Sequence, residues 1–540
     1  MSGDREPRLV RFWWLLMAPL VASAWTRQLW APDEPRYAEI AREIYEGSSF
    51  LVMHLCGQLY PDKPPLLFWL SGFFGWLSGW SEPWMRLPSL AATLGSALLI
   101  VRIGRRWWGP TPGRLAAALY LSTYMVTEIG GRLQIDPLLA FFCLLALELI
   151  DRPARTRRGR VLLVLAAGLA VGVGGLAKGP VALVNVGLVA LAWGWLAPRS
   201  EQPRAGWPAW TGFAALAVLP MLGWALLASA VEPALASELF FGQHAGRITQ
   251  ADRHPGPLWK HLLRMPLLLL PWTVAVVGGL VAGLRELARR EEPNHDLGIL
   301  RATLWLAALV VFFSVIPPKR DLYLLPAYPA AALLGAVYLE RRIEDGRASR
   351  WVTLPGPLVL LAAGVVVAFA PLAVDLPPGL GWQAPVIGLA AVAGAIWTLA
   401  ALRRRGLRSW TDGLLATWLV FTTLTAALVF PLVNPVKSTR AAALAIAARP
   451  ERPSEIPCLG VRPEGFRFYG DGALPAVPGD DRDLGDMLAR EGGDFLALVH
   501  LDRWEALAPT LGDRVRVVGE HRVGGKPFVL LGAAESDENH

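Results

Sequence analysis

Charged residues are scarce in this chain, and their scarcity decides its broad class. Asp, Glu, Lys and Arg make up 18% of the 540 residues, whereas 54% of the residues are hydrophobic and the mean hydropathy is +0.39. Soluble domains typically carry about 25% charged residues, so this composition excludes an ordinary soluble fold. The sequence predicts a polytopic membrane protein.

Cysteine is also rare, with three residues in the whole chain, which excludes a disulfide-dense scaffold. Cys143 lies inside an apolar run. Cys56 and Cys458 lie in segments that the hydropathy pattern leaves outside the membrane, and they can pair only if those segments pack together. The sequence leaves this disulfide undecided.

Several familiar sequence signatures are missing as well. The chain has neither a Walker A nucleotide-binding loop nor a Rossmann dinucleotide-binding fingerprint. Its first apolar run, RFWWLLMAPLVASAW, has no small-residue cleavage site, which favours an uncleaved transmembrane helix over a signal peptide. A net charge of +8 can indicate a protein that binds nucleic acid. Here, however, the arginines form short clusters between apolar runs, as membrane topology requires.

Apolar runs long enough to cross about 30 Å of hydrocarbon recur along the chain. We expect about thirteen transmembrane helices, beginning near residues 9, 84, 114, 133, 159, 178, 208, 263, 299, 321, 352, 382 and 410. The aromatic ends of several runs, such as Trp107 with Trp108, suit the belts at the membrane surface.

The arginine clusters fall on alternate connections between these helices, so they predict the orientation of the chain. We expect the N-terminal tail and the basic connections near residues 102–114, 152–160, 198–204, 285–290, 340–350 and 403–408 to face the cytoplasm. The outer side then receives the first loop of about 31–83, the connections at 132–136, 178, 317–321 and 375–381, the loop of about 232–262 and the residues after about 435.

We expect the chain to lie in the cytoplasmic (inner) membrane. A change of composition near residue 435 predicts that it has two domains. Residues 1–435 form an all-α transmembrane domain, whose first outer loop at 31–83 contains interfacial helices. In residues 436–540 the apolar runs shorten to strand length, in DFLALVHL, RVRVVGEH and KPFVLLG, between turn residues. We expect these residues to form a small periplasmic α/β domain.

Polar residues that need a chemical explanation gather on the outer side. The stretch APDEPRYAEIAREIYEG predicts a short interfacial helix from Pro35, and Asp33 with Glu34 directly precedes it. A carboxylate that emerges straight from a span has little structural use unless Arg36 pairs with it. The other outer segments LYPDKPP, RLQIDP, GLAKGP, FGQHAGRI and KRDLYLL supply Tyr60, Asp62, Lys63, Arg132, Asp136, Lys178, His244, Arg247, Lys319, Arg320 and Tyr323.

Each of these residues also has a purely structural interpretation. The lysines and Arg320 can extend to phospholipid phosphates, Asp136 before Pro137 can cap a helix, and Tyr323 can belong to an aromatic belt. A loop histidine such as His244 is more often an exposed polar residue than a metal ligand, and no partner at metal-ligand spacing accompanies it.

Several cations and a carboxylate on one side of a membrane suit transfer of a sugar from a polyprenyl phosphate. The lipid tail stays in the bilayer and the phosphate leaves as an anion. Lys63, Lys178, Arg247 and one of Lys319 or Arg320 would stabilise that charge. A carboxylate would take the proton of the acceptor hydroxyl, and the phosphate leaving group makes a nucleotide-binding loop unnecessary.

These segments, in this order, resemble the membrane glycosyltransferases of the GT-C type. The likeness is nearest to the lipid A 4-amino-4-deoxy-L-arabinose transferases and the protein O-mannosyltransferases, and it rests on DEPRYAEIAREI, YPDKPPLLFWL, RLQIDP, GLAKGP, FGQHAGRI and KRDLYLLPAYP. It covers about the first 340 residues. It implies an inverting transfer from an undecaprenyl-phosphate-type donor to lipid A, another glycolipid or a protein.

The resemblance also implies roles for individual residues. Asp33 would be the catalytic carboxylate with Asp136 assisting, and Lys63 would hold the donor phosphate. No cofactor is required. A divalent metal shared by Asp62 and His244 stays open, although Asp62 stands where this group usually has Glu, and the shorter side chain argues against that contact. The cavity would be lined by Glu34, Arg36, Tyr37, Tyr60, Asp62, Arg132, Lys178, His244, Arg247 and Tyr323.

Three other function classes stay open at this stage. A transporter or flippase of lipid-linked sugars also needs a charged cavity, but it predicts charges at mid-membrane depth on broken helices. An O-antigen ligase or polymerase shares the substrates and topology. A non-catalytic assembly factor would leave the acid and the lysine of the first loop without a role.

Overall fold

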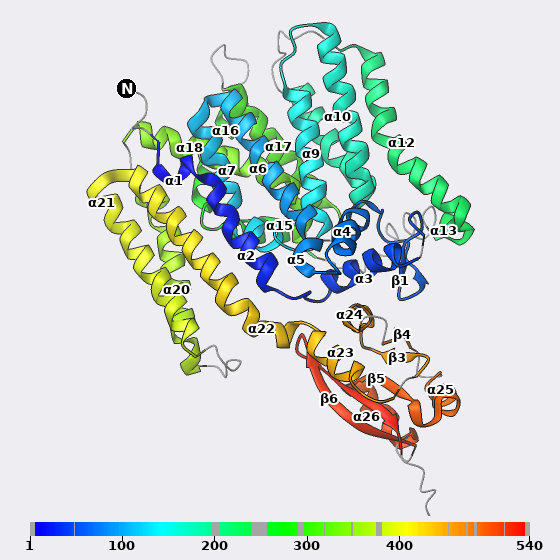
Figure 1. The fold of residues 1–540 in the computed structure, drawn as a ribbon. Helices are drawn as coiled ribbons and strands as arrows, with labels where there is room; N and C mark the ends of the chain where they lie inside the picture. The colour runs from blue at the N-terminus through cyan, green and yellow to red at the C-terminus, as the bar shows by residue number, and fades with distance from the viewer. Residues whose placement is uncertain are drawn as a thin grey trace, which may run out of the picture. The chain divides into compact units, whose positions relative to one another are not determined.

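The computed structural model describes most of the chain, and its fold is predominantly helical (Figure 1). The described residues are 6–47, 49–196, 205–238, 256–289, 296–317, 319–346, 349–373, 381–451, 453–470, 474–479, 483–511 and 514–534. They pack into two compact units built from interleaved parts of the chain. The first contains the residues up to Trp25, Pro61–Leu67 and Arg86–Val429, and the second contains Thr26–Tyr60, Phe68–Met85 and the residues from Phe430 onward.

The first unit is a bundle of apolar helices. Its elements are α1 (Arg8–Arg11), η1 (Trp13–Met17), α2 (Ala18–Thr26), α6 (Leu87–Trp108), α7 (Pro110–Leu121), α8 (Tyr124–Ile129), α9 (Ile135–Asp151), α10 (Arg157–Lys178), α11 (Val181–Leu196), α12 (Trp207–Val231), α13 (Pro233–Ser237), α15 (Lys260–Leu268), α16 (Thr273–Ala288), α17 (Leu297–Val315), η3 (Asp321–Ala327), α18 (Tyr328–Glu344), α19 (Arg350–Thr353), α20 (Pro355–Ala373), α21 (Gln383–Leu424) and η4 (Thr425–Val429). Figure 1 shows α9, α10 and α12 running side by side.

Seven helical segments of the described chain are long and apolar enough to cross a membrane. They begin at Leu87, Arg157, Trp207, Leu297, Asp321, Arg350 and Gln383, and three shorter apolar helices cover Trp13–Thr26, Leu66–Leu77 and Val181–Leu196. The chain is therefore a multi-pass membrane protein, as the composition predicts. The expected number of thirteen spans stays a prediction.

The outer surface of α12 is apolar, as a surface that faces lipid must be. Leu219, Leu226 and Leu227 are 57%, 56% and 59% exposed. Such a continuous apolar face would be a serious liability in water. The same helix packs closely on α10, where a Cβ atom added to Gly168 would lie 2.6 Å from the backbone oxygen of Phe213. Small residues thus allow the close approach that drives helix association in membranes.

The longest helix, α21, consists of two arms that meet at Gly406. Gly406 has a φ of 77°, which a residue with a side chain adopts only at a cost. The arms fold back on each other, so that the hydroxyl oxygens of Thr398 and Thr417 lie 3.4 Å apart. The two arms correspond to the helices expected near residues 382 and 410.

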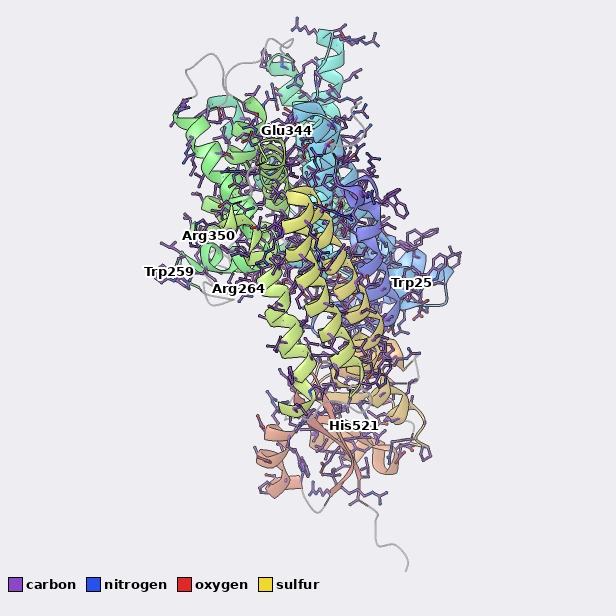
Figure 2. All side chains as sticks on the ribbon, turned by 90° about the vertical axis from the view of Figure 1, so that its left-hand side faces the viewer. Trp25, Trp259, Arg264, Glu344, Arg350 and His521 are labelled. Atoms are coloured by element: carbon purple, nitrogen blue, oxygen red, sulfur yellow. The ribbon has the colours of Figure 1, made fainter. Side chains whose placement is uncertain are left out.

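Exposed tryptophans mark one level of the helical unit. Trp25, at the end of α2, is 51% exposed, and Trp259, before α15, is 58% exposed. Figure 2 shows the two side chains projecting outward from different sides at a similar height along the helices. Tryptophan prefers the boundary between hydrocarbon and water. This level therefore marks one surface of the membrane.

The second unit combines short helices with two β-sheets. Its elements are α3 (Asp33–Tyr45), β1 (His54–Leu55), β2 (Gln58–Leu59), most of α4 (Leu66–Leu77), α5 (Glu82–Met85), α22 (Phe430–Lys437), α23 (Arg440–Ala447), β3 (Ile456–Leu459), α24 (Glu464–Tyr469), β4 (Ala476–Pro478), α25 (Asp483–Glu491), η5 (Gly492–Asp494), β5 (Leu496–His500), α26 (Leu501–Leu511), β6 (Val515–Val523) and β7 (Lys526–Ala533). The three strand-length runs identified in the sequence are β5, β6 and β7.

The larger sheet has the strand order β4-β3-β5-β7-β6. Strand β3 is parallel to β4 and β5, whereas β7 is antiparallel to β5 and β6. Alternate residues of β5 pack on opposite faces: Leu498 contacts the cluster that includes Phe466, and Ala497 contacts the cluster that includes Met487. The sheet is thus covered on both faces.

The three cysteines are free and buried in the structure. Cys56 follows β1, Cys143 lies in α9, and Cys458 lies in β3. The open question of a bridge between Cys56 and Cys458 is therefore answered in favour of separate thiols.

Candidate active site

Three of the predicted site residues meet at one end of the helical unit. Lys178 ends α10 and forms an ion pair with Asp136 in the first turn of α9. The Lys178 ammonium also lies 4.8 Å from the ring centroid of Tyr323, which belongs to η3. The side chains of Lys178 and Asp136 are only 14% and 8% exposed. The structure thus brings together residues from three outer connections that the sequence placed on the same side.

The helix-cap interpretation of Asp136 is wrong. Helix α9 begins at Ile135 with Gln134 as its N-cap, and the carboxylate of Asp136 pairs with Lys178 instead. An acid in the first turn still suits the positive end of the helix dipole. Its direction, however, is determined by the lysine of the neighbouring helix.

The arginines expected on the cytoplasmic side lie at the opposite end of the same helices. Arg106 at the end of α6 binds Glu148 and Asp151 at the end of α9, with N–O distances of 3.1 and 2.6 Å. Arg301 at the start of α17 also pairs with Asp151. The 12 residues from Asp136 to Glu148 span about 18 Å of helix. The two sets of polar residues are therefore well separated along the bundle.

Lys319 and Arg320 have different surroundings. The Lys319 ammonium is buried and donates hydrogen bonds to the backbone oxygens of Ser314, at 2.8 Å, and of Ile316. Burial and the neighbouring Lys260 ammonium lower the pKa of Lys319. Arg320 is half-buried at the start of η3. The ammonium of Lys319 therefore holds the end of α17 together, which favours Arg320 over Lys319 as a phosphate ligand.

Asp33 in the second unit is held by an ion pair. Its carboxylate binds the guanidinium of Arg36, which also lies 5.5 Å from the ring centroid of Tyr37. Helix α3 begins at Asp33, two residues before the expected start at Pro35, because acids are favourable in a first turn. The pairing with Arg36 is the structural use that the sequence left open for this acid, and it also orients the carboxylate.

Two tyrosines of the predicted site pack on one phenylalanine. The rings of Tyr37 and Tyr60 meet the ring of Phe68 edge-on, with centroids 5.7 and 6.3 Å apart. Both tyrosines are buried. Edge-to-face packing of this kind stabilises a fixed ring position. The aromatic residues therefore support α3 from the side of α4.

Glu34 has a partner that the sequence analysis missed. The fully buried Arg27 lies with Nη2 3.3 Å from the Glu34 carboxylate, and its guanidinium stacks 4.6 Å from the ring centroid of Trp30. The only sequence signal was an arginine seven residues before an acid, in RQLWAPDE. Glu34 therefore has a structural role in fixing the chain ahead of α3.

The polar face of α3 is buried, which differs from the expected interfacial helix. Arg42 binds Glu39 through two hydrogen bonds of 3.0 and 2.9 Å, and Glu39 is completely buried. Arg467 of α24 donates a third hydrogen bond to Glu39, and Tyr469 donates one to Glu82. Helix α24 covers the charged side of α3, so these charges lie inside the second unit.

The surroundings of the remaining predicted site residues do not indicate a chemical role. Asp62 and Lys63 are half-buried in the segment Pro61–Leu67 of the first unit, and Arg132 pairs with Glu128 one helical turn earlier. Arg247 and His244 lie outside the described residues. Within the described part of the chain no group of three or more His, Cys, Asp or Glu side chains is arranged for a metal ion.

Comparisons with known proteins agree with this architecture. The sequence profile of the dolichyl-phosphate-mannose-protein mannosyltransferases matches residues 62–224. An undecaprenyl phosphate-α-4-amino-4-deoxy-L-arabinose arabinosyl transferase of Edwardsiella ictaluri is 31% identical over 69% of this chain and 67% of its own. Such a transferase of Sodalis glossinidius is 33% identical, with 70% and 68% covered.

Solved structures show the same fold. The apo structure of ArnT from Cupriavidus metallidurans superposes with a TM-score of 0.77 at 22% identity, covering 98% of this chain and 99% of that one. The structure of that protein bound to undecaprenyl phosphate gives a TM-score of 0.73 at 21% identity, with 98% of both chains covered.

The resemblance to this group of glycosyltransferases is therefore confirmed. The sequence identity and coverage establish the family, and the solved structures share the fold of the whole molecule. The protein is a glycosyltransferase and belongs to the family of undecaprenyl phosphate-α-4-amino-4-deoxy-L-arabinose arabinosyl transferases.

Proposed function

We propose that this glycosyltransferase moves 4-amino-4-deoxy-L-arabinose from undecaprenyl phosphate to lipid A, on the outer side of the cytoplasmic membrane. The donor is the one in the printed names of the relatives from Edwardsiella and Sodalis. The proposed topology has about thirteen spans, a cytoplasmic N-terminus, a transmembrane domain at 1–435 and a periplasmic α/β domain at 436–540. The segregation of arginines to the other end of the helices supports this orientation.

The observation that carries the proposal is the setting of Lys178. Its ammonium has three N–H donors. The structure gives it one carboxylate partner, Asp136, and one aromatic ring, that of Tyr323. A lysine at a helix end, aimed by an acid and still rich in donors, suits the phosphate of a donor whose tail lies in the bilayer.

The proposed reaction is a single displacement at the anomeric carbon of the sugar. The acceptor hydroxyl oxygen attacks this carbon as the bond from the carbon to the phosphate oxygen breaks. The Asp33 carboxylate takes the hydroxyl proton, and undecaprenyl phosphate leaves with the electron pair. One displacement inverts the configuration at the anomeric carbon.

The other residues receive supporting roles in this proposal. Lys63, Lys178, Arg247 and Arg320 stabilise the negative charge on the leaving phosphate. Asp136 positions Lys178, and Arg36 positions Asp33, because each forms an ion pair with its partner. No step is assigned to a metal ion.

Membership of a transferase family disfavours the transporter, the ligase and the assembly factor. The arrangement of charges in the helical unit also disfavours a transporter. A flippase is expected to carry charges at mid-membrane depth on broken helices. The ion pairs of Asp136 and of Asp151 instead lie at the two ends of α9.

The proposal is tested with purified protein, undecaprenyl phosphate-linked 4-amino-4-deoxy-L-arabinose and lipid A. Mass spectrometry should detect lipid A carrying one added sugar. Nuclear magnetic resonance of the product should show that the configuration at the anomeric carbon is inverted. Lipid A should also lack this sugar in a strain without the gene, compared with its parent. Transfer to a protein or polysaccharide, with lipid A unmodified, would show that lipid A is not the acceptor.

A further inference from the structure

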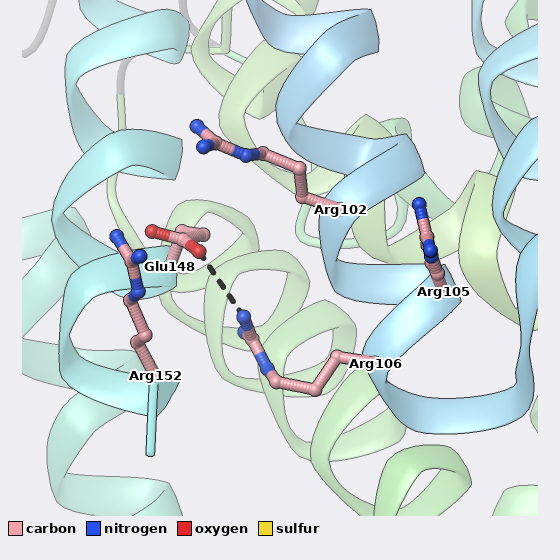
Figure 3. Close-up of a pocket in the computed structure, with 5 residues that line it drawn as sticks. All are labelled: Arg102, Arg105, Arg106, Glu148 and Arg152. Carbon is pink, nitrogen blue, oxygen red and sulfur yellow. Dashed lines mark hydrogen bonds and ion pairs between the residues drawn. The ribbon is translucent and has the colours of Figure 1, made fainter. Parts of the chain in front are cut away.

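A polar cavity lies at the end of the helical unit opposite Lys178 and Asp136. It has a volume of about 330 Å³ and is lined by Arg102, Arg105, Arg106, Glu148 and Arg152. Figure 3 shows Arg102 and Arg106 extending from α6, and Arg152 from the end of α9, toward the space beside Glu148. This group is called the arginine cavity below.

The two acids next to the arginine cavity are already neutralised. Glu148 and Asp151 both bind Arg106, and Asp151 also binds Arg301 and accepts a hydrogen bond of 2.9 Å from Trp107 Nε1. Two carboxylates therefore face two guanidinium groups. Asp151 thus has two arginine partners and a tryptophan donor.

Three arginines of the cavity keep their charge uncompensated. Among the described residues, Arg102, Arg105 and Arg152 form no ion pair within 4.0 Å, and Arg102 and Arg152 are exposed. Arg102 and Arg106 are also four residues apart on one helix, where like charges repel. The dipoles of α6 and α9 favour positive charge at these ends, but they do not explain why arginines of two helices converge on one cavity.

The height of the arginine cavity indicates which anion it meets. Trp107 and Trp108 follow directly after Arg106 at the end of the membrane-spanning helix α6. Tryptophans at the end of a span lie at the level of the phospholipid headgroups. Arginine suits a phosphate at this level, because its planar fork matches two phosphate oxygens.

We propose that the arginine cavity binds the phosphodiester headgroup of an anionic phospholipid. Arg102 and Arg152 contact the phosphate oxygens from two helices, while Arg106 stays with Glu148 and Asp151. Basic pockets between transmembrane helices are a known means of holding anionic lipids. The cavity is separate from the proposed transfer reaction, since α9 places Glu148 about 18 Å from Asp136.

The test compares two double variants by native mass spectrometry in detergent, with phosphatidylglycerol, phosphatidylethanolamine or inorganic phosphate added. Arg102→Gln with Arg152→Gln should weaken retention of phosphatidylglycerol by about tenfold or more, because each basic residue near a lipid surface contributes to anionic lipid binding. The matched control is Arg404→Gln with Arg405→Gln, which removes two exposed arginines beside Gly406, outside the cavity. It should change retention less than about twofold.

Three results would overturn the proposal. Equal losses in both double variants would mean general attraction by surface arginines. Equal retention of phosphatidylethanolamine and phosphatidylglycerol by the parent protein would remove the role of lipid charge. Binding of inorganic phosphate without phosphatidylglycerol would assign the cavity to a soluble anion. The melting temperature without added lipid shows that each variant is folded, and the single variant Arg152→Gln supplies a milder change.

Discussion

The guanidinium Nε of Arg467 donates a hydrogen bond of 3.1 Å to Oε1 of Glu39, across 428 positions of the chain. Glu39 is completely buried, and it also binds Arg42 of the same helix. Helix α3 also carries Asp33, the proposed base. Arg467 therefore connects α24 of the C-terminal region to the helix on which the proposed chemistry depends.

Removing Arg467 should destabilise the second unit. Arg467→Gln removes one of the two arginines that bind Glu39, and truncating one partner of a buried charge pair costs about 2 kcal/mol or more. For a unit of this size we expect the melting temperature to fall by roughly 4 to 8 °C. Arg490→Gln is the control, because Arg490 is 59% exposed and its ion pairs should contribute little. An equal shift in the two variants would contradict a special role for Arg467.

The stability of the second unit should depend on the protonation of Glu43. Burial, and then the neighbouring charge of Glu39, raise the pKa of Glu43 from 4.5 to about 7. The folded protein thus keeps this proton where the unfolded chain has lost it. The stabilisation is fully present below pH 4.5 and is lost as the pH rises through about 7.

The size of this effect is on the order of 1 to 2 kcal/mol, because partial exposure of Glu43 screens part of the shift. Melting temperatures measured between about pH 5 and about pH 8 should therefore fall as the pH rises. Glu43→Gln keeps a neutral side chain at every pH, so its curve should be flatter than that of the parent. Parallel curves would show that another group titrates.

Asp33→Asn should abolish sugar transfer without unfolding the protein. Loss of a positioned general base typically lowers the rate by about 100-fold to 10,000-fold. The amide keeps the shape of the carboxylate and can still contact Arg36, so the melting temperature should change little. Turnover of lipid A is measured by mass spectrometry, with Asp345→Asn, an exposed residue after α18, as the control. Near-parental turnover by Asp33→Asn would remove Asp33 from the mechanism.

Lys178 and Lys319 should respond differently to the same substitution. Lys178→Gln removes the cation beside Asp136, so we expect KM for the polyprenyl donor to rise by about tenfold while KM for lipid A stays similar. Lys319→Gln removes an ammonium that binds the backbone oxygens at the end of α17. It should lower the melting temperature more than it alters KM for the donor.

The measurement is steady-state kinetics with each substrate varied in turn, together with thermal unfolding of both variants. If Lys319→Gln raised KM for the donor as strongly as Lys178→Gln, at an unchanged melting temperature, Lys319 would regain the phosphate role. If Lys178→Gln affected both substrates equally, its assignment to the donor phosphate would be wrong.

Much of the fold could be predicted because it depends on local patterns. Long apolar runs identified the helices, and short apolar runs between turn residues identified β5, β6 and β7. Strand β3, Ile456–Leu459, was not predicted, because it is only four residues long and contains Pro457, which argues against a strand. The sequence predicts that α3 begins at Pro35, whereas the helix begins two residues earlier, at Asp33.

The candidate site was predicted as a set of residues but not as a set of contacts. The sequence named Asp136, Lys178 and Tyr323 from three separate segments, and the structure joins them. It also named Lys319, whose neighbours turned out to be carbonyl groups of its own chain segment. An ammonium looks the same in the sequence whether it binds a phosphate or holds the end of a helix.

The sequence by itself determined that the chain enters a membrane, and it predicted which way its basic connections face and which outer segments carry the chemistry. These properties follow from hydropathy, charge and short motifs, which are local along the chain. Only the tertiary structure decided that Glu39 meets Arg467, that Lys178 pairs with Asp136 and that arginines of α6 and of the end of α9 line one cavity. Such pairings depend on how distant helices pack, and packing is determined by the whole set of side chains at once.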